Sequence, residues 1–199
     1  MSSRVDMEKQ RLLNIKLALI GTYNVGKSYL GKRWMTGEYI DKPQSTIAAA
    51  YLTKNVYIDD KEIKCHVWDT AGSEKYNSII PIYIRDAQVV MICFETFNED
   101  KVLLHVDMVT STNKDASIFL VLTKCDIDNG NNIGSICEFA KTNNFPFFKT
   151  SAKTGEGVKD LFEYATRIAF LAKEDMEYVK FLNINNEEEL VQQGCCVVL

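Results

Sequence analysis

The chain has 199 residues, of which 46% are hydrophobic and 25% charged, the balance of an ordinary soluble globular protein. This length predicts one compact domain with a full hydrophobic core. The formal net charge of −4 comes from residues 173–199, where two lysines stand against six acidic residues. The remaining body is formally neutral and lacks the basic face of a nucleic-acid-binding protein, so no nucleic-acid partner is expected.

Cysteine spacing and the first residues exclude several other classes. Cys65, Cys93, Cys125 and Cys137 are scattered singly, without C-x-x-C pairs or a nearby set of histidines, which argues against a zinc site and a disulfide framework. Residues 1–14 lack the apolar core of a signal peptide, and no apolar run is long enough to span a membrane. We therefore expect a protein of the reducing cytosol.

Apolar runs and helical patterns alternate along the chain. We expect strands at 15–20, 48–58, 62–68, 88–94, 117–122 and 145–148, and helices at 28–35, 99–110, 132–141 and 158–172. The turn at Asp59-Asp60 is so tight that its two strands must be antiparallel, whereas strands separated by helices run parallel. Residues 36–47 and 69–80 are expected to be loops. The predicted fold class is α/β, a six-stranded, mainly parallel sheet with helices on both faces.

Residues 21–28, with the sequence G-T-Y-N-V-G-K-S, fit the P-loop pattern between the first strand and the first helix. Backbone N–H groups of such a loop and the helix N-terminus attract a phosphate, and Lys27 adds a positive charge. The hydroxyl of Ser28 can ligate Mg²⁺. The alternative is a glycine-rich turn that binds nothing.

Three further polar segments each follow a predicted strand. Ligands of parallel sheets bind at the carboxyl ends of the strands, so these segments are expected at the same edge as the P-loop. Asp69, in D-T-A-G, is placed to hold Mg²⁺ through water, and Gly72 offers an unobstructed N–H to a terminal phosphate. An ordinary D-x-x-G turn is the alternative for this segment.

The other two segments suit a guanine base. In T-K-C-D, Asp126 can accept two hydrogen bonds from the N1–H and the amine of guanine, a pattern that adenine does not offer. The aliphatic part of Lys124 can lie on the purine face. In T-S-A-K, the backbone N–H of Ala152 can reach the carbonyl oxygen of guanine.

These motifs, in this order and together with Thr46, resemble the Ras superfamily of small GTPases over residues 14–172. Segment 45–51 resembles switch I of the Rab branch, and segment 75–85 is similar to its switch II, particularly that of the endosomal subgroup. Among the departures from the pattern, Thr123 stands where most members have asparagine, and Ala48 and Asp86 replace glycines. The resemblance implies a P-loop NTPase small G domain at 14–172, with an N-terminal extension at 1–13 and a flexible hypervariable tail at 173–199.

The resemblance also implies the ligands, GTP or GDP with Mg²⁺. Ser28 and Thr46 would ligate the metal directly and Asp69 through water, while Thr46 and the N–H of Gly72 would hold the γ-phosphate. The ring of Tyr39 would pack against guanine. The implied nucleotide contacts are Asn24, Val25, Gly26, Lys27, Ser28, Tyr29, Tyr39, Thr46, Gly72, Thr123, Lys124, Asp126, Ser151, Ala152 and Lys153.

Protein partners are implied through both switch segments: effectors, exchange factors and GTPase-activating proteins. The residues that match the effector-binding surface of Rab proteins are Ile47, Ala48, Tyr51, Trp68 and Tyr83. The three aromatic residues among them are also consistent with plain core or half-buried packing.

Two substitutions fall beside the implied γ-phosphate position. Ser73 stands where the family has the glutamine that orients the attacking water, and Tyr23 stands where Ras has glycine and Rab proteins usually have a small residue. With Gly72 and Lys27 they form the implied catalytic set. Harmless variation is one interpretation, and slow GTP hydrolysis is the other.

The sequence ends in C-C-V-V-L, and its last four residues fit C-a-a-X with a terminal leucine that favours geranylgeranylation. The alternative is a frayed tail with exposed thiols. Lipidation at Cys195 and Cys196 would involve prenylation and GDI-type machinery. It would place the protein on the cytoplasmic face of an endosomal or secretory membrane, cycling with the cytosol.

The sequence is therefore consistent with three functions. The first is a membrane-attached, guanine-nucleotide-gated switch, and the second a scaffold that stays loaded with GTP because Tyr23 and Ser73 abolish hydrolysis. The third, a metabolic P-loop enzyme such as a nucleoside kinase, leaves the T-K-C-D and T-S-A-K segments unexplained.

Overall fold

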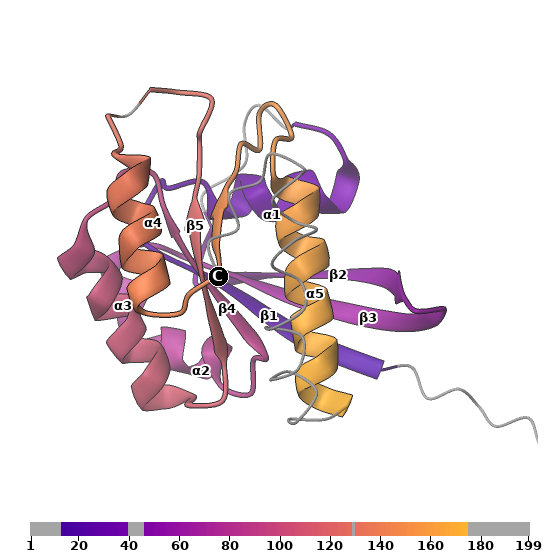
Figure 1. Cartoon of the computed structure of the whole chain (residues 1–199). Coiled ribbons are helices and arrows are strands. Elements are labelled where there is room, and N and C mark those ends of the chain that lie inside the picture. The colour runs from indigo at the N-terminus through magenta and orange to yellow at the C-terminus, as the bar shows by residue number, and fades with distance from the viewer. Residues whose placement is uncertain (1–12, 40–45, 129, 175–199) are drawn as a thin grey trace, which may run out of the picture.

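A computed structural model describes residues 13–39, 46–128 and 130–174 of the chain, and it contains one six-stranded sheet in the order β2-β3-β1-β4-β5-β6 (Figure 1). The strands are β1 (Leu13–Ile20), β2 (Ala49–Ile58), β3 (Lys61–Thr70), β4 (Val89–Phe94), β5 (Ser117–Leu122) and β6 (Phe147–Lys149). Only β2 and β3 pair antiparallel, and the other four pairings are parallel. The predicted fold class is confirmed.

The helices lie on both sides of this sheet (Figure 1). They are α1 (Lys27–Thr36), the 3-10 helix η1 (Glu74–Ile79), α2 (Ile80–Ile84), α3 (Glu99–Thr112), α4 (Ile133–Thr142) and α5 (Val158–Glu174). The asparagine side chains of Asn98 and Asn132 accept N–H bonds at the starts of α3 and α4, which explains why both helices begin where they do.

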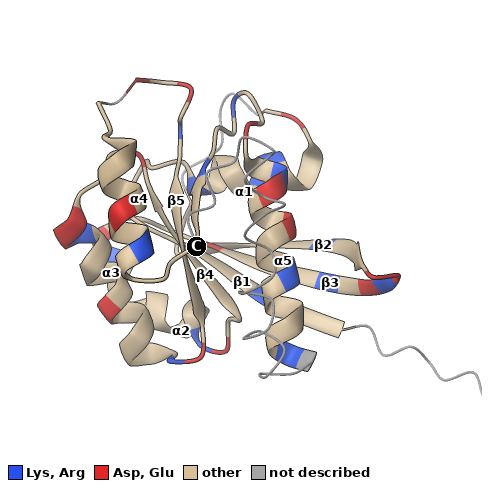
Figure 2. Cartoon of the chain, viewed as in Figure 1, with Lys and Arg blue, Asp and Glu red and all other residues tan. Residues whose placement is uncertain are grey.

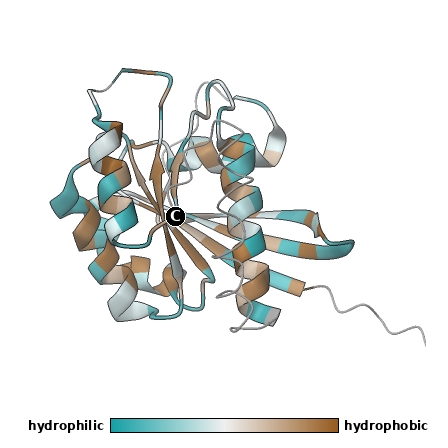
Figure 3. Cartoon of the chain, in the orientation of Figure 1, coloured by the Kyte–Doolittle hydropathy of each residue, from teal (hydrophilic) through white to brown (hydrophobic). Residues whose placement is uncertain are grey.

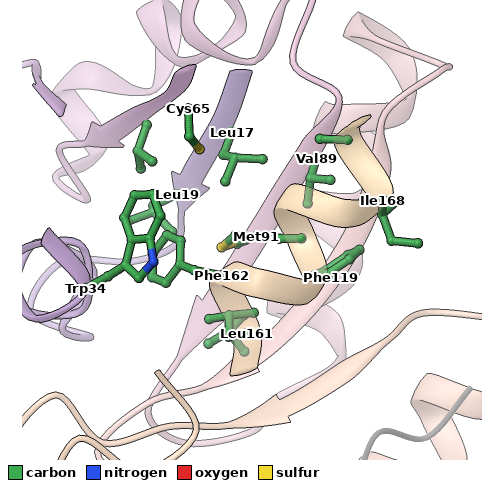
Figure 4. Close-up of a cluster of buried hydrophobic side chains, with 14 of the residues drawn as sticks. Leu17, Leu19, Trp34, Cys65, Val89, Met91, Phe119, Leu161, Phe162 and Ile168 are labelled. Carbon is green, nitrogen blue, oxygen red and sulfur yellow. The ribbon is translucent and has the colours of Figure 1, made fainter. Parts of the chain in front are cut away.

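Two clusters of buried apolar side chains hold the layers together. One joins α1 and α5 to the sheet, and within it the rings of Trp34 and Phe162 stack with centroids 4.4 Å apart (Figure 4). The other joins α2, α3 and α4 to the opposite face. Strands β4 and β5 contribute side chains to both clusters, because they are covered by helices on both faces of the sheet. Nearly all their side chains are buried, and their sequences are accordingly continuous apolar runs (Figure 3).

The prediction of a loop over residues 69–80 was wrong. Strand β3 continues to Thr70, and η1 and α2 occupy most of the rest. Pro81 lies in the first turn of α2, where its missing N–H costs no hydrogen bond, and Ile80 and Ile84 are buried against the sheet. Packing of these two isoleucines therefore stabilises a helix that is too short for a periodic sequence pattern.

Part of one sheet face lies outside both clusters. Ile63, Cys65 and Val67 of β3 pack toward α1 and α5, so by alternation His66 and Trp68 point to the other side of the sheet. Among the described residues, none from β2 or β3 belongs to the cluster beneath α2, α3 and α4. This open face of β2 and β3 carries Tyr51, whose side chain is 51% exposed.

The surface mixes charges of both signs, and basic and acidic segments are interspersed on the helices and at the turn between β2 and β3 (Figure 2). None of the helices in the described ranges combines the length and the apolar character that crossing a membrane requires.

Candidate nucleotide-binding site

The P-loop connects the end of β1 to the start of α1. Gly26 has φ 101° at the helix N-cap, a conformation that favours glycine, and Asn24 also has a positive φ of 64°. No side chain caps this helix start. The first N–H groups of α1 therefore remain available to an anion.

Lys27 is buried inside this loop rather than extended into solvent. Its Nζ donates to the carbonyl oxygens of Gly21 and Thr22, each at 2.8 Å. Burial lowers the pKa of Lys27, and the neighbouring Asp69 and Cys93 only partly oppose this shift. The loop thus fixes a cation where the P-loop pattern predicts phosphate oxygens.

The three predicted metal ligands lie together. The hydroxyls of Ser28 and Thr46 are 2.8 Å apart, and the Thr46 hydroxyl donates to Asp69 Oδ2 at 3.4 Å. Asp69 is only 2% exposed, and its Oδ1 has no hydrogen-bond partner among the described residues. Burial raises the pKa of Asp69, although hydrogen bonds and Lys27 counteract it. Two hydroxyls and a carboxylate with an unsatisfied oxygen match the oxygen ligands of Mg²⁺, so these residues fit that ion.

The D-T-A-G segment lies directly against the P-loop. A Cβ at Gly72 would stand 2.3 Å from the carbonyl oxygen of Thr22 and 2.5 Å from the backbone nitrogen of Tyr23, so only glycine fits there. The backbone N–H of Ala71 donates to the carbonyl of Ala48 at 2.8 Å. Segments 46–48 and 69–72 are therefore tied both to each other and to the P-loop.

Tyr23 and Ser73, the two substitutions beside the implied γ-phosphate position, differ in exposure. Tyr23 is 67% exposed. Ser73 is partly buried at the start of η1, where its carbonyl accepts the N–H of Tyr76.

Thr123 joins the base-recognition segment to the P-loop. Its buried hydroxyl contacts the carbonyl oxygen of Val25 and lies 3.1 Å from that of Phe94. Threonine at this position thus makes a bond that spans two of the predicted nucleotide-binding segments.

The predicted guanine-binding residues are brought to one edge of the sheet. Asp126 is exposed, and its Oδ1 accepts a hydrogen bond from the buried Ser151 hydroxyl at 2.6 Å, which orients the carboxylate. Ala152 is half-buried next to this pair, and Lys153 is exposed. An oriented acceptor pair beside a phosphate cradle suits a guanine nucleotide.

Comparison with known proteins agrees with this geometry. A sequence model described as the Ras family matches residues 16–170. The chain belongs to the Ras family. It is also 32% identical over 158 residues to Ras-related protein Rab-5A of Dictyostelium discoideum, an alignment that covers 76% of this chain and 79% of that relative. The protein is a Rab-like small GTPase.

In this Ras-family chain, Tyr39 packs against a second aromatic residue. Its ring stacks on that of Tyr29, with centroids 5.6 Å apart, and it is 39% exposed. Tyr29 lies in α1 and Tyr39 is the last described residue before the gap at 40–45, so the two rings form an aromatic platform at the first turn of α1.

Three of the five residues predicted to bind effectors, Tyr51, Trp68 and Tyr83, lie together. The Trp68 ring lies 4.9 Å from that of Tyr51 and 5.3 Å from that of Tyr83, measured between centroids. Ile47 is 78% exposed, and Ala48 has a φ of 61°. These aromatic residues lie on the open face of β2 and β3 and at its border with α2.

Two further residues support the predicted base-binding segment. Glu95 pairs with Lys124, their charged atoms 2.5 Å apart. Asn131 donates to the Glu95 carbonyl and accepts the N–H of Phe97, both at 2.8 Å. Glu95 follows β4 directly, so it could be predicted from its place at a strand end, as Asp69 and Asp126 are. Asn131 carries no comparable signal.

We predict that Thr123→Val lowers the free energy of unfolding by about 1–3 kcal/mol, because it leaves the buried Val25 carbonyl without its hydroxyl donor. Thr123→Ser keeps the hydroxyl and is the matched control. Urea unfolding of the wild type and both variants, at one nucleotide and Mg²⁺ concentration, measures the effect. Equal stability of Thr123→Val and Thr123→Ser would contradict a stabilising bond.

Proposed function

We propose that this small GTPase is a guanine-nucleotide-gated switch of the Rab type, which recruits effectors to membranes in vesicular traffic and hydrolyses GTP slowly. The observation that carries the proposal is the contact of segments 46–48 and 69–72 with each other and with the P-loop. Two segments held at one phosphate site are ordered together and released together when the terminal phosphate leaves.

Different residues around the P-loop would bind the phosphates of GTP and the Mg²⁺ ion. Lys27 and the N–H groups of residues 24–29 would neutralise the phosphates, and Ser28, Thr46 and Asp69 would hold Mg²⁺, which supplies charge neutralisation between phosphate oxygens. The backbone N–H of Gly72 and the hydroxyl of Thr46 would meet the γ-phosphate. Loss of that phosphate removes a partner from both segments at once, which is the basis of the switch.

At the base end, Asp126 would accept hydrogen bonds from guanine while Ser151 orients it, and the N–H of Ala152 would reach the guanine carbonyl. Lys124, fixed by Glu95, would lie along the purine. The aromatic pair of Tyr29 and Tyr39 would flank the nucleotide.

Slow hydrolysis follows from the side chains beside the γ-phosphate position. The attacking water must be held in line, and a glutamine side chain does so by donating and accepting at once. Ser73 is too short to reach the same water. The exposed ring of Tyr23 adjoins the contact between the P-loop and Gly72, where an activating protein would insert its arginine finger.

A second candidate is a scaffold loaded permanently with GTP, without significant hydrolysis. The side chains of Ser73 and Tyr23 favour this candidate too, because they would weaken both intrinsic GTP hydrolysis and hydrolysis assisted by an activating protein. The two candidates differ only in whether GDP is ever formed at a useful rate.

The proposed partners follow from the exposed switch surface and the chain terminus. Effectors, exchange factors and activating proteins would bind segments 45–51 and 75–85, including Ile47, and the Tyr51–Trp68–Tyr83 cluster. Cys195 and Cys196 lie outside the described residues. Their lipidation, with prenylation and GDI-type machinery, would hold the protein on the cytoplasmic face of an endosomal or secretory membrane.

The test of the proposed function is base specificity. Asp126→Asn exchanges a double acceptor for an amide and should weaken GTP binding by several kcal/mol, at about 1.5–3 kcal/mol per charge-assisted hydrogen bond. The variant should bind xanthine nucleotides better. Asp128→Asn, at a nearby exposed residue whose carboxylate accepts a local backbone N–H from Gly130, is the control in the same titration. Unchanged GTP affinity in Asp126→Asn would show that the base binds elsewhere.

Single-turnover hydrolysis tests the catalytic proposal. We expect a slow wild type, a faster intrinsic reaction in Ser73→Gln, and a larger gain in Tyr23→Ser when an activating protein is present, because an arginine finger is worth about 10³–10⁵ in rate. Activators of the TBC type supply their own glutamine, which could replace Ser73 but would not make room beside Tyr23.

Tyr57→Ser, at an exposed tyrosine near the far end of β2, is the control for removing an exposed ring. The catalytic proposal fails if the wild type already hydrolyses GTP as fast as an ordinary Rab, or if neither single substitution raises the rate.

Membrane attachment is expected to need both terminal cysteines. One lipid chain binds only marginally and reversibly, and the acidic tail offers no polybasic second signal. Cell fractionation should therefore show that Cys195→Ser and Cys196→Ser each shift the protein to the soluble fraction, while Cys137→Ser does not. Full membrane retention of Cys195→Ser would exclude a second anchor.

A further inference from the structure

A hollow of about 300 Å³ lies beside the open face of β2 and β3. It is lined by residues from the starts of β1 and β4, from β2 and β3, and from the end of α5, among them Asn14, Lys16, Tyr51, His66, Trp68 and Lys173. None of the P-loop or base-recognition residues lines it. The nucleotide would lie at the carboxyl ends of the parallel strands, whereas this hollow lies toward their amino ends.

Two lysines give the hollow its charge. The ammonium of Lys16 lies 5.8 Å from the centroid of the Trp68 ring and donates to the Arg85 carbonyl. The ammonium of Lys173 donates to the Asn14 carbonyl at 2.5 Å. Among the described side chains, neither forms a salt bridge with a carboxylate. Both cations are thus held in place by neutral carbonyls.

One carboxylate, Asp86, belongs to the lining. Its charge raises the pKa of Lys16, but burial lowers that pKa by more. Two lysines and one aspartate give the lining an excess of one positive charge. A carboxylate from a bound ligand would neutralise this charge.

The wall of the hollow is aromatic and hydrogen-bonded. His66 Nε2 donates to Asn14 Oδ1 at 2.7 Å, because an amide oxygen can only accept, and His66 Nδ1 therefore accepts from the Tyr51 hydroxyl. Burial and the charges of Lys64 and Lys173 lower the pKa of His66, which keeps the ring neutral. The rings of Tyr51 and His66 stack with centroids 5.7 Å apart, so the wall is fixed.

We propose that this hollow docks a protein partner through a carboxylate side chain next to an aromatic one, with the carboxylate at Lys16 and Lys173 and the aromatic ring against Tyr51 and Trp68. Charge complementarity selects the carboxylate, and the half-buried aromatic wall selects an apolar neighbour. Tyr51 and Trp68 also belong to the proposed effector surface, so the identification of the partner as an effector rests on the proposed function.

Two blocked dipeptides that differ in a single group test the proposal: acetyl-Phe-Glu amide and acetyl-Phe-Gln amide. They are titrated onto the full chain, and the two tryptophan indole N–H signals are followed by NMR. Trp68 lines the hollow, whereas Trp34 is buried on the other side of the sheet and serves as an internal control. Millimolar affinity is expected for ligands of this size.

The glutamate peptide should shift the Trp68 signal and bind at least about tenfold tighter than the glutamine peptide, since charge-assisted hydrogen bonds are about twice as strong as neutral ones. Lys16→Gln should remove most of this preference. Lys173→Gln, at the exposed end of α5, should reduce it without disturbing the sheet. Lys159→Gln, at an exposed lysine of the same helix, should leave it unchanged.

Equal affinity for the two peptides, or the absence of any Trp68 shift, would overturn the proposal. Tighter binding of inorganic phosphate than of the glutamate peptide would also overturn it, in favour of a phosphorylated ligand or a lipid headgroup. A chain that prefers the glutamate peptide but binds no guanine nucleotide would retain the inference and refute the proposed function. A chain that binds guanine nucleotide but shows no preference for the glutamate peptide would refute the inference and retain the proposed function.

Discussion

Asp69 is buried at the end of β3, and one of its carboxylate oxygens has no partner among the described residues. The sheet dictates this position, because β3 pairs with β1 in a register that sets Asp69 beside Leu19, just before the P-loop. Burial of a charge is costly unless a cation or hydrogen bonds compensate it. Ser28, Thr46 and Lys27 supply part of the compensation, and a bound divalent ion would supply the rest. The site is therefore arranged around a carboxylate that needs a ligand.

The same residue explains why distant segments are coupled. Thr46 reaches Asp69 across 23 residues of sequence, and Gly72, three residues beyond Asp69, contacts the P-loop backbone. A change at the phosphate position acts on both segments, since both depend on the same few contacts. These segments lead directly into the aromatic cluster of Tyr51, Trp68 and Tyr83 on the open sheet face, which is the surface proposed for partners.

Much of this arrangement could be predicted from the sequence. The apolar runs of β4 and β5 predict buried strands, and both strands are buried. Polar residues at or just after the carboxyl ends of parallel strands are expected at one edge of the sheet, where Asp69, Thr123 and Asp126 lie. The short helix α2 could not be predicted, because its five residues carry no periodic pattern and are stabilised by burying Ile80 and Ile84. Nor could the hollow at Lys16, because it joins the starts of β1 and β4 to β2, β3 and the end of α5, which are far apart in the chain. Residues 1–12 and 175–199, which make up most of the predicted N-terminal extension (1–13) and tail (173–199), lie outside the described part.

The most direct test of a guanine-nucleotide switch with slow hydrolysis is the nucleotide that the protein carries when freshly purified from cells. Extraction and chromatography of the bound ligand should give close to one guanine nucleotide per chain, mostly GTP. A chain that carries mostly GDP would contradict slow hydrolysis, and one that carries adenine nucleotides or none would contradict the account as a whole.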